Sequence, residues 1–466
     1  MKVVANINIS RKSLLISNSF LLFSCLVSIM IFTDNNRPDV YGYLWFLPLI
    51  FGIFVWLYSF ISRNIWKNFS SIALIGIFSI RNIITPLLMR LGNYDGYFKS
   101  LSTSNVNKAI ILMLYESIVL LIYVSWKLNN NNWLSNPNQV VRNIELNSKE
   151  KLLFFVFMLI LIATRIIRPD FYSGFSNIFA STDIRLTEVN ESALGITYTL
   201  FSLICPLAYL SICIFLIKLI NSRIQIGLLK VILNLLVLTI PLFFMSNSDG
   251  FTLISIASMA LVIYQVGGIS KKVLVIVVGG TIIGIFMYIL LMVVGLSFGA
   301  EGTSMSNQIS KAFQAYFPGV CNVASFFNID GYNKLETLFY DLYYTIPFRN
   351  TLFGIEGDNR LAVLYASDNN AKSQILPCVC QLFFYCSILA PMIECLFAKY
   401  AMYSYNRSQA QRSVYKLYVY NMCFIYCVLT PIMYNFTIFF TRLFVTILPL
   451  TFIGSIIESK VNPDKC

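Results

Sequence analysis

Long runs of apolar residues, separated by short polar stretches, dominate the pattern along this chain. A helix needs about 20 predominantly apolar residues to cross a lipid bilayer, and runs of that length recur from one end of the sequence to the other. Turn residues separate even the closest pair of runs. The predicted spans are 14–32, 43–61, 69–89, 108–126, 151–167, 195–217, 229–245, 250–266, 272–296, 374–397, 414–432 and 437–457.

These runs predict an all-α, polytopic membrane protein, with about twelve transmembrane helices in a single transmembrane domain over residues 1–466. The composition agrees, because 57% of the residues are hydrophobic and only 12% are charged. The 34 Lys and Arg outnumber the 21 Asp and Glu, and this surplus lies between the apolar runs. The surplus of basic residues is therefore expected to set the orientation of the protein in a membrane. Membrane lipids are expected partners, and nucleic acid is not.

The basic residues are unevenly divided between the two sides of the predicted membrane. If the N-terminus is cytosolic, the short loops on its side carry most of the Lys and Arg, which is the usual bias of cytosolic loops. An even number of spans then puts both termini in the cytosol. Most of the acidic residues, and a larger share of Arg among the basic residues, fall on the outer side.

Two outer loops are much longer than the others, at 165–194 and 297–373. Loops of more than about 15 residues are usually functional or disordered. The second loop is rich in aromatic and aliphatic residues, which argues against disorder and favours short helices along the outer membrane interface. We therefore expect any chemistry to take place on the outer side.

The chain contains no histidine, which excludes Ser-His-Asp triads, Cys-His pairs and HExxH metal sites. Its eleven cysteines fall mostly inside apolar runs, where a free thiol behaves as a small hydrophobic group. Cys378 and Cys380 form a CxC pair, but no second pair stands at zinc-site spacing. The sequence therefore predicts no metal and no other cofactor.

Five arginines in the two outer loops are the main binding candidates: Arg165, Arg168 and Arg185 in the first, and Arg349 and Arg360 in the second. Guanidinium groups grip phosphate and carboxylate bidentately, so residues on two loops could clamp a lipid diphosphate from two sides. Arg165 and Arg168 could instead anchor the end of their helix by reaching to the lipid headgroups.

Arg81 lies inside the third predicted span, which makes it a functional candidate because a charge within the membrane is costly. Glu116, in the next span, lies at about the same depth. The two could pair for structural reasons or take part in binding. Arg442 lies a turn or two inside the last span, and Glu394 is interpreted as an interfacial residue near the cytosolic end of its span.

Two passages, Ile80–Leu88 and Asn370–Cys395, together with the number of spans and the two long outer loops, resemble the Wzy-type O-antigen and capsular polysaccharide polymerases. The resemblance covers nearly the whole chain. In that family, arginines of the two outer loops are thought to bind the lipid-linked sugar. The matching residues here are Arg165, Arg168, Arg185, Arg349 and Arg360, with Arg81 as a further candidate.

The resemblance implies a multi-pass protein of the bacterial inner membrane that polymerises undecaprenyl-diphosphate-linked oligosaccharide repeat units by metal-independent glycosyl transfer. A chain-length regulator protein is an implied partner. The reaction needs a base for the attacking sugar hydroxyl, and a carboxylate must serve because there is no histidine. The candidates, in falling order, are Glu356, Asp358, Glu191 and Asp183.

Two other functions share parts of this pattern. O-antigen ligases have a similar topology, but they rely on a loop histidine that this chain lacks. A lipid-linked oligosaccharide flippase is the alternative from another class, since it also needs about twelve spans and a basic cavity. The long outer loop, and the few charges deep in the membrane, favour the polymerase.

Overall fold

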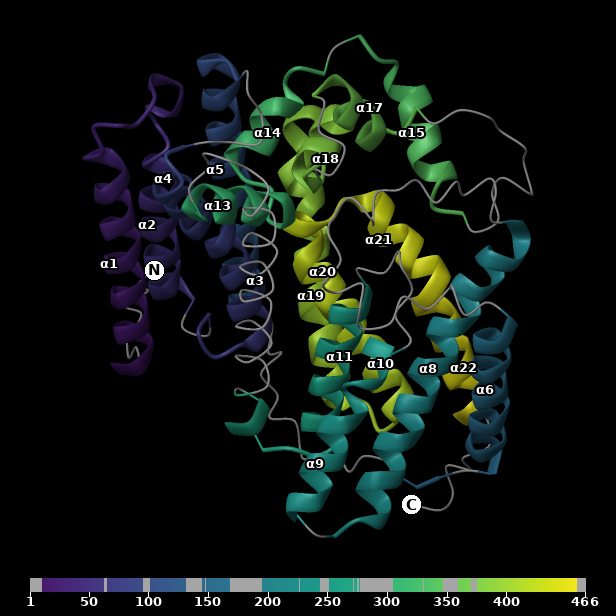
Figure 1. Ribbon diagram of the computed structural model, residues 1–466. Coiled ribbons are helices and arrows are strands. Elements are labelled where there is room, and N and C mark those ends of the chain that lie inside the picture. The colour runs from purple at the N-terminus through teal and green to yellow at the C-terminus, as the bar shows by residue number, and fades with distance from the viewer. Residues whose placement is uncertain are drawn as a thin grey trace.

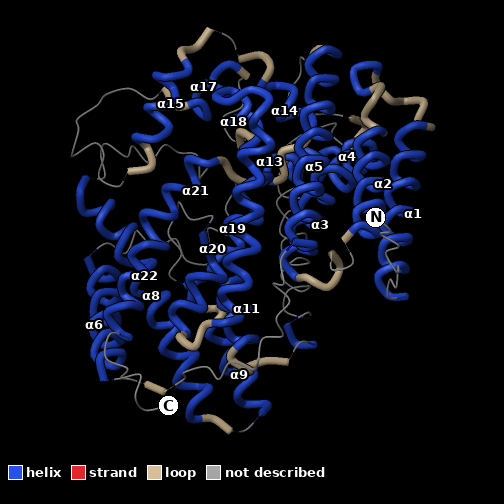
Figure 2. The backbone as a smooth tube through the Cα atoms, turned by 180° about the vertical axis from the view of Figure 1, so that it is seen from behind, coloured by secondary structure: helices blue, strands red, loops and turns tan. Residues whose placement is uncertain are grey.

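The computed structural model describes residues 11–62, 65–94, 101–130, 145–146, 148–167, 195–225, 227–243, 251–270, 272–274, 276, 305–329, 331–346, 359–369 and 375–458. Within these ranges the secondary structure is helical, with no β-strand. Long helices run side by side, and short helices gather at one end (Figure 1). The same arrangement is seen from behind in Figure 2. The all-α class predicted from the sequence is thus confirmed.

Eight helices of the described part are long and apolar enough to cross a membrane. The protein is therefore a helical, multi-pass membrane protein. The eight helical stretches are Arg11–Phe32, Asp39–Ile61, Phe69–Leu91, Thr103–Asn130, Leu203–Arg223, Cys378–Ala410, Val414–Met433 and Phe436–Ile457.

The first four stretches contain α1 (Arg11–Phe32), η1 (Asp39–Tyr41), α2 (Phe46–Ile61), α3 (Phe69–Ser79), η2 (Ile80–Ile84), α4 (Thr85–Leu91) and α5 (Thr103–Asn130). The later ones contain α8 (Gly195–Arg223), α18 (Cys378–Cys386), η5 (Ser387–Leu389), α19 (Ala390–Ala410), α20 (Val414–Met433), α21 (Phe436–Arg442), η6 (Leu443–Ile447) and α22 (Leu448–Glu458).

The remaining four predicted spans are not among the eight. Charged residues near both ends of α6 (Ser148–Ile167) leave an apolar stretch shorter than a bilayer crossing needs. The pair predicted at 229–245 and 250–266 forms α9 (Gly227–Val237), α10 (Ile240–Phe243) and α11 (Phe251–Gln265), all shorter than a full span. Most of 272–296 lies outside the described residues. A total of twelve spans therefore stays a prediction.

Four short helices occupy the described part of the long segment 297–373: α13 (Met305–Tyr316), α14 (Val320–Phe326), α15 (Lys334–Tyr343) and α17 (Leu361–Asp368). Three of them, α14, α15 and α17, lie at the top of Figure 1 and define what is called below the upper end. The sequence predicted short helices in this segment, and the structure has them.

Side-chain contacts fix the direction of the helices. Tyr41, which follows α1, has its hydroxyl 3.2 Å from the Sγ of Cys321 in α14, so α1 ends at the upper end. The amine of Lys149, at the start of α6, donates to the carbonyl of Ile456 in the last turn of α22 at 3.3 Å. The start of α1 (Arg11) and the end of α22 (Glu458) therefore lie at the opposite end, called the lower end (Figure 1). Which side of a bilayer the lower end faces stays a prediction.

Helices α1 and α2 pack closely because small residues face each other. A Cβ atom added to Gly52 of α2 would collide with the side chain of Ser24 in α1. Small residues at such contacts let helix backbones approach, which is how helices associate where lipid surrounds them. The opposite face of α1 exposes large apolar side chains such as Leu15, Leu22 and Leu26, as expected of a surface that meets lipid tails.

Candidate functional site

A widened helical turn places Arg81 and Asn82 in the protein interior. Pro86 has no backbone N–H and cannot form the regular helical bond. The N–H of Thr85 bonds to the carbonyl of Ile80, five residues back, and the Thr85 hydroxyl donates to the same carbonyl at 3.0 Å. This makes η2 a π-helical segment, a distortion that often accompanies functional sites.

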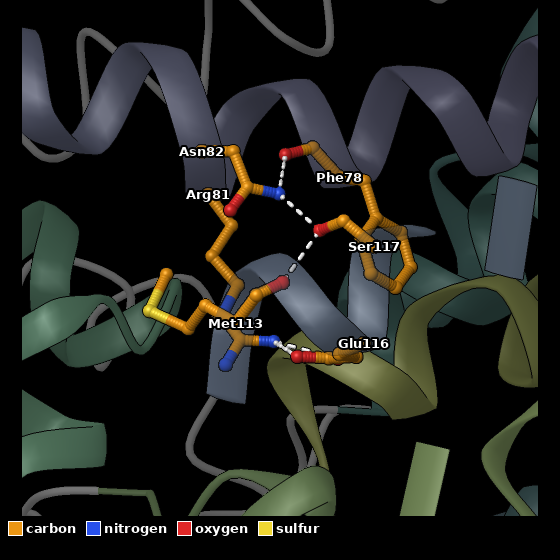
Figure 3. Close-up of polar contacts among 6 residues, drawn as sticks. All are labelled: Phe78, Arg81, Asn82, Met113, Glu116 and Ser117. Atoms are coloured by element: carbon orange, nitrogen blue, oxygen red, sulfur yellow. Dashed lines mark hydrogen bonds and ion pairs between the residues drawn. The ribbon is translucent and has the colours of Figure 1, made fainter. Parts of the chain in front are cut away.

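Arg81 forms a buried ion pair with Glu116 of α5. Its Nη1 lies 2.8 Å from both carboxylate oxygens, and each side chain is only 1% exposed. Figure 3 shows the guanidinium of η2 reaching across to the carboxylate of α5. The pairing predicted from equal depth is thus confirmed. The other guanidinium nitrogens, Nε and Nη2, have no hydrogen-bond partner in the described part of the chain.

A second contact lies beside the ion pair, one residue further along both helices. The Nδ2 of Asn82 donates to the Ser117 hydroxyl at 3.1 Å and to the Phe78 carbonyl at 3.0 Å. The Ser117 hydroxyl in turn donates to the Met113 carbonyl at 2.8 Å (Figure 3). Two adjacent polar contacts fix the register of η2 against α5, since sliding either helix would break both.

The interpretation of Glu394 as an interfacial residue is wrong. The bent stretch Cys378–Ala410 is 33 residues long, so Glu394 lies near its middle and not near an end. The side chain is 1% exposed, and its carboxyl group faces that of Glu116. The error arose because the apolar run was expected to stop at 397, whereas α19 continues to Ala410. Arg81, Glu116 and Glu394 are called the ion cluster below.

A second polar cluster lies at the upper end around Asp341 of α15, which is completely buried. Its carboxylate accepts hydrogen bonds from the Gln381 amide at 2.6 Å, the Tyr385 hydroxyl at 2.7 Å and the backbone N–H of Leu361 at 3.2 Å. Asp341 therefore joins α15 to the start of α17 and to α18. The Gln381 amide also donates to the Thr437 hydroxyl of α21 at 2.8 Å. These residues are called the upper cluster.

Arg360 precedes α17 and adds a positive charge to the upper cluster. Its guanidinium carbon lies 3.7 Å from the centre of the Tyr344 ring, which is close enough for a cation–π contact. Burial raises the pKa of the Asp341 carboxyl, while the bonds from Tyr385, Gln381 and Leu361 and the charge of Arg360 oppose that rise. Arg360 is partly buried and partly exposed.

The structure describes three of the predicted site residues and separates them. Arg81 is buried in η2, Arg165 is exposed near the end of α6, and Arg360 is at the start of α17. Helix α6 lies well below α17 in both views (Figures 1 and 2). The other predicted residues fall outside the described ranges: Arg168, Arg185, Arg349, Asp183, Glu191, Glu356 and Asp358.

Sequence reasoning missed Asp341, Gln381 and Tyr385. Gln381 and Tyr385 are spaced four residues apart, on one face of α18, and Gln381 is the one amide between the CxC pair and a run of aromatic residues. That spacing could have marked both as inward-facing polar residues. Asp341 gives no such signal, because its partners come from two other helices, α17 and α18, that are distant in the sequence.

Within the described residues, no group of three or more Cys, Asp or Glu side chains is placed to hold a metal ion. Comparison with known protein families, curated proteins and solved structures finds no match to this chain.

Proposed function

We propose that this protein is a metal-independent glycosyltransferase that polymerises undecaprenyl-diphosphate-linked oligosaccharide repeat units at the outer face of the bacterial inner membrane. The observation that carries the proposal is Arg360, a partly exposed arginine held over Tyr344 at the upper end. That end bears the long segment to which the sequence assigns arginines and carboxylates on the outer side. A guanidinium fixed in this way is suited to grip a diphosphate.

In the proposed reaction, a hydroxyl of the incoming unit attacks the anomeric carbon of the sugar that carries the growing chain. The bond from that carbon to the lipid diphosphate breaks, and the diphosphate leaves with the electron pair. Arginine side chains stabilise the charge that develops on it. The hydroxyl proton passes to a carboxylate, for which Glu356 and Asp358 are the first candidates because they precede Arg360 closely in the sequence.

The stacking on Tyr344 and the nearby Asp341 hold Arg360 in one orientation before substrate arrives. A preorganised cation needs no rearrangement when charge develops, and this is the main source of electrostatic catalysis. Arg360→Lys would keep the charge but lose the planar, bidentate contact and the stacking. The proposal therefore distinguishes charge from geometry at this position.

The test is polymerisation by purified protein in liposomes that contain lipid-linked repeat units. Arg360→Ala should abolish multi-unit glycan at normal protein abundance, and Arg360→Lys should restore only part of it. Arg407→Ala is the matched control. The guanidinium carbon of Arg407 also lies over a tyrosine ring, 5.3 Å from the centre of Tyr403, but Arg407 is in the last turn of α19, away from the upper end. Full-length glycan from Arg360→Ala would contradict the proposal.

A lipid-linked oligosaccharide flippase remains the second candidate, and one observation favours it. Glu394 adds a third ionisable side chain deep among the helices, and such residues often line transport pathways. The two functions separate when the lipid-linked units are already accessible at the active face. Formation of multi-unit glycan then supports the enzyme, and movement of single units across the bilayer without joining supports the transporter.

A further inference from the structure

The ion cluster contains more carboxyl groups than cations. Arg81 of η2 supplies one positive charge, while Glu116 of α5 and Glu394 of α19 supply two carboxyl groups. All three side chains are 1% exposed. With both carboxyl groups ionised, the cluster would hold a net negative charge away from water, which is strongly unfavourable unless it is neutralised.

The contacts show which carboxyl group lacks compensation. Glu116 already takes the Nη1 of Arg81 with both of its oxygens. Among the described residues no N–H or hydroxyl donates to either oxygen of Glu394, and its carboxyl group lies within hydrogen-bonding distance of that of Glu116. An ionised carboxylate can only accept hydrogen bonds. Two ionised groups in this position would therefore repel each other without any bond between them.

The other titratable side chains around the cluster do not supply a charge of the right sign. Of the residues that the structure describes, the thiols of Cys378 and Cys380 in α18 and of Cys395 in α19 are the other titratable groups near Glu394. A thiol is either neutral or negative. Among the described residues, Arg81 is thus the one cation acting on both carboxyl groups.

We propose that Glu394 and Glu116 bind one proton between them, so that the ion cluster is a neutral proton-binding site inside the helix bundle. The proton turns one carboxyl group into a donor and replaces a repulsive contact by a short O–H···O bond. Aspartic-protease dyads show that two adjacent carboxyl groups can share a proton in this way. This site is independent of the proposed glycosyl transfer.

The proton links the positions of three helices. When it leaves, Glu394 becomes an uncompensated anion beside Glu116, and the contact between α19 and α5 becomes repulsive. The Nε and Nη2 of Arg81 have no partner and offer a second, bidentate position for that carboxylate. Loss of the proton would therefore move Glu394 toward η2, so the site can sense pH within the bundle.

Infrared difference spectroscopy on the full-length protein in lipid nanodiscs tests this directly. At neutral pH the wild type should show the carbonyl stretching band of a protonated carboxyl group, and the band should shift in heavy water. Glu394→Gln should lose it, whereas Glu336→Gln, which alters an exposed carboxylate of α15, should keep it. A band of unchanged intensity in Glu394→Gln, or no band in the wild type, overturns the proposal. Any weaker band that Glu394→Gln keeps should disappear when Asp341, a buried carboxyl group with a raised pKa outside the ion cluster, is also replaced by Asn.

A second measurement protects the test against a variant that does not fold. The wild-type protein should lose thermal stability as pH rises, because a proton bound in the folded state stabilises it only while it stays bound. The infrared band should disappear over the same pH range. If added sodium ions, and not pH, change both readouts, the cluster binds a metal cation and the proton-binding proposal fails.

Discussion

The ion cluster and the upper cluster both bury a carboxylate, but they compensate for it in different ways. Glu116 is balanced by a full positive charge on Arg81 at 2.8 Å. Asp341 is balanced mainly by neutral donors, from an amide, a phenol and a backbone N–H. Removing one partner of a buried ion pair leaves the other charge without any compensation. Removing one of several hydrogen-bond donors leaves the carboxylate bound by the remaining donors, so the loss of stability is smaller.

The largest effect is expected from Arg81→Leu, which leaves two carboxyl groups buried with no cation. Removing one partner of a buried ion pair costs about 3–5 kcal/mol. We expect a large loss of folded protein, measured as abundance in the membrane and as thermal unfolding in detergent. The charge-swapped variant Arg81→Glu with Glu116→Arg should regain part of the lost abundance. Equal loss in the single and double variants would count against structural pairing.

A smaller effect is expected from Asp341→Ala, which leaves the donors of Gln381, Tyr385 and Leu361 without their acceptor. Each unsatisfied buried group costs about 1–3 kcal/mol, but Tyr385 and Gln381 can turn toward other partners. We expect a drop in unfolding temperature and faster proteolysis around α17. An unchanged proteolytic pattern would show that Asp341 does not hold α17 in place.

The pH dependence of the upper cluster follows from the raised pKa of Asp341. A folded-state pKa above the unfolded value means that the folded protein binds more protons, so this contribution to stability is lost as pH rises through the folded-state pKa. Asp341→Asn should flatten that part of the stability profile. The proton proposed at Glu394 changes stability with pH in the same direction. Asp341→Asn should therefore be compared with Asp341 in proteins that both carry Glu394→Gln. If the pH profile of stability is the same in both, the prediction is contradicted.

The smallest effect concerns Ser387, which connects the two clusters at the break between α18 and α19. Its φ of 51° lies in the left-handed region, where a side chain is unfavourable and glycine is preferred. Ser387→Gly should relieve a backbone strain of about 1–3 kcal/mol, and the greater conformational entropy that glycine loses on folding, about 0.5–1 kcal/mol, offsets part of this gain. We therefore expect a small rise in the unfolding temperature. Ser455→Gly, inside α22 and also exposed, is the control and should lower it.

The sequence by itself determined the helical, membrane-spanning character of the protein, because the bilayer requires long apolar runs and these are visible residue by residue. It also led to the Arg81 and Glu116 pair, since equal depth on neighbouring spans is simple arithmetic. It failed where helix length differed from the apolar run, as for Glu394, whose helix continues through polar residues to Ala410.

Only the tertiary structure decided which polar groups meet. Asp341, Gln381 and Tyr385 come from segments far apart in the chain, and no local pattern encodes a contact between them. The same holds for Glu394 against Glu116, which lie on α19 and α5. The apolar pattern of a helix indicates which of its faces are buried or in contact with lipid. Which polar side chains contact each other depends on how the helices pack, and the same packing determines where a buried charge can be neutralised.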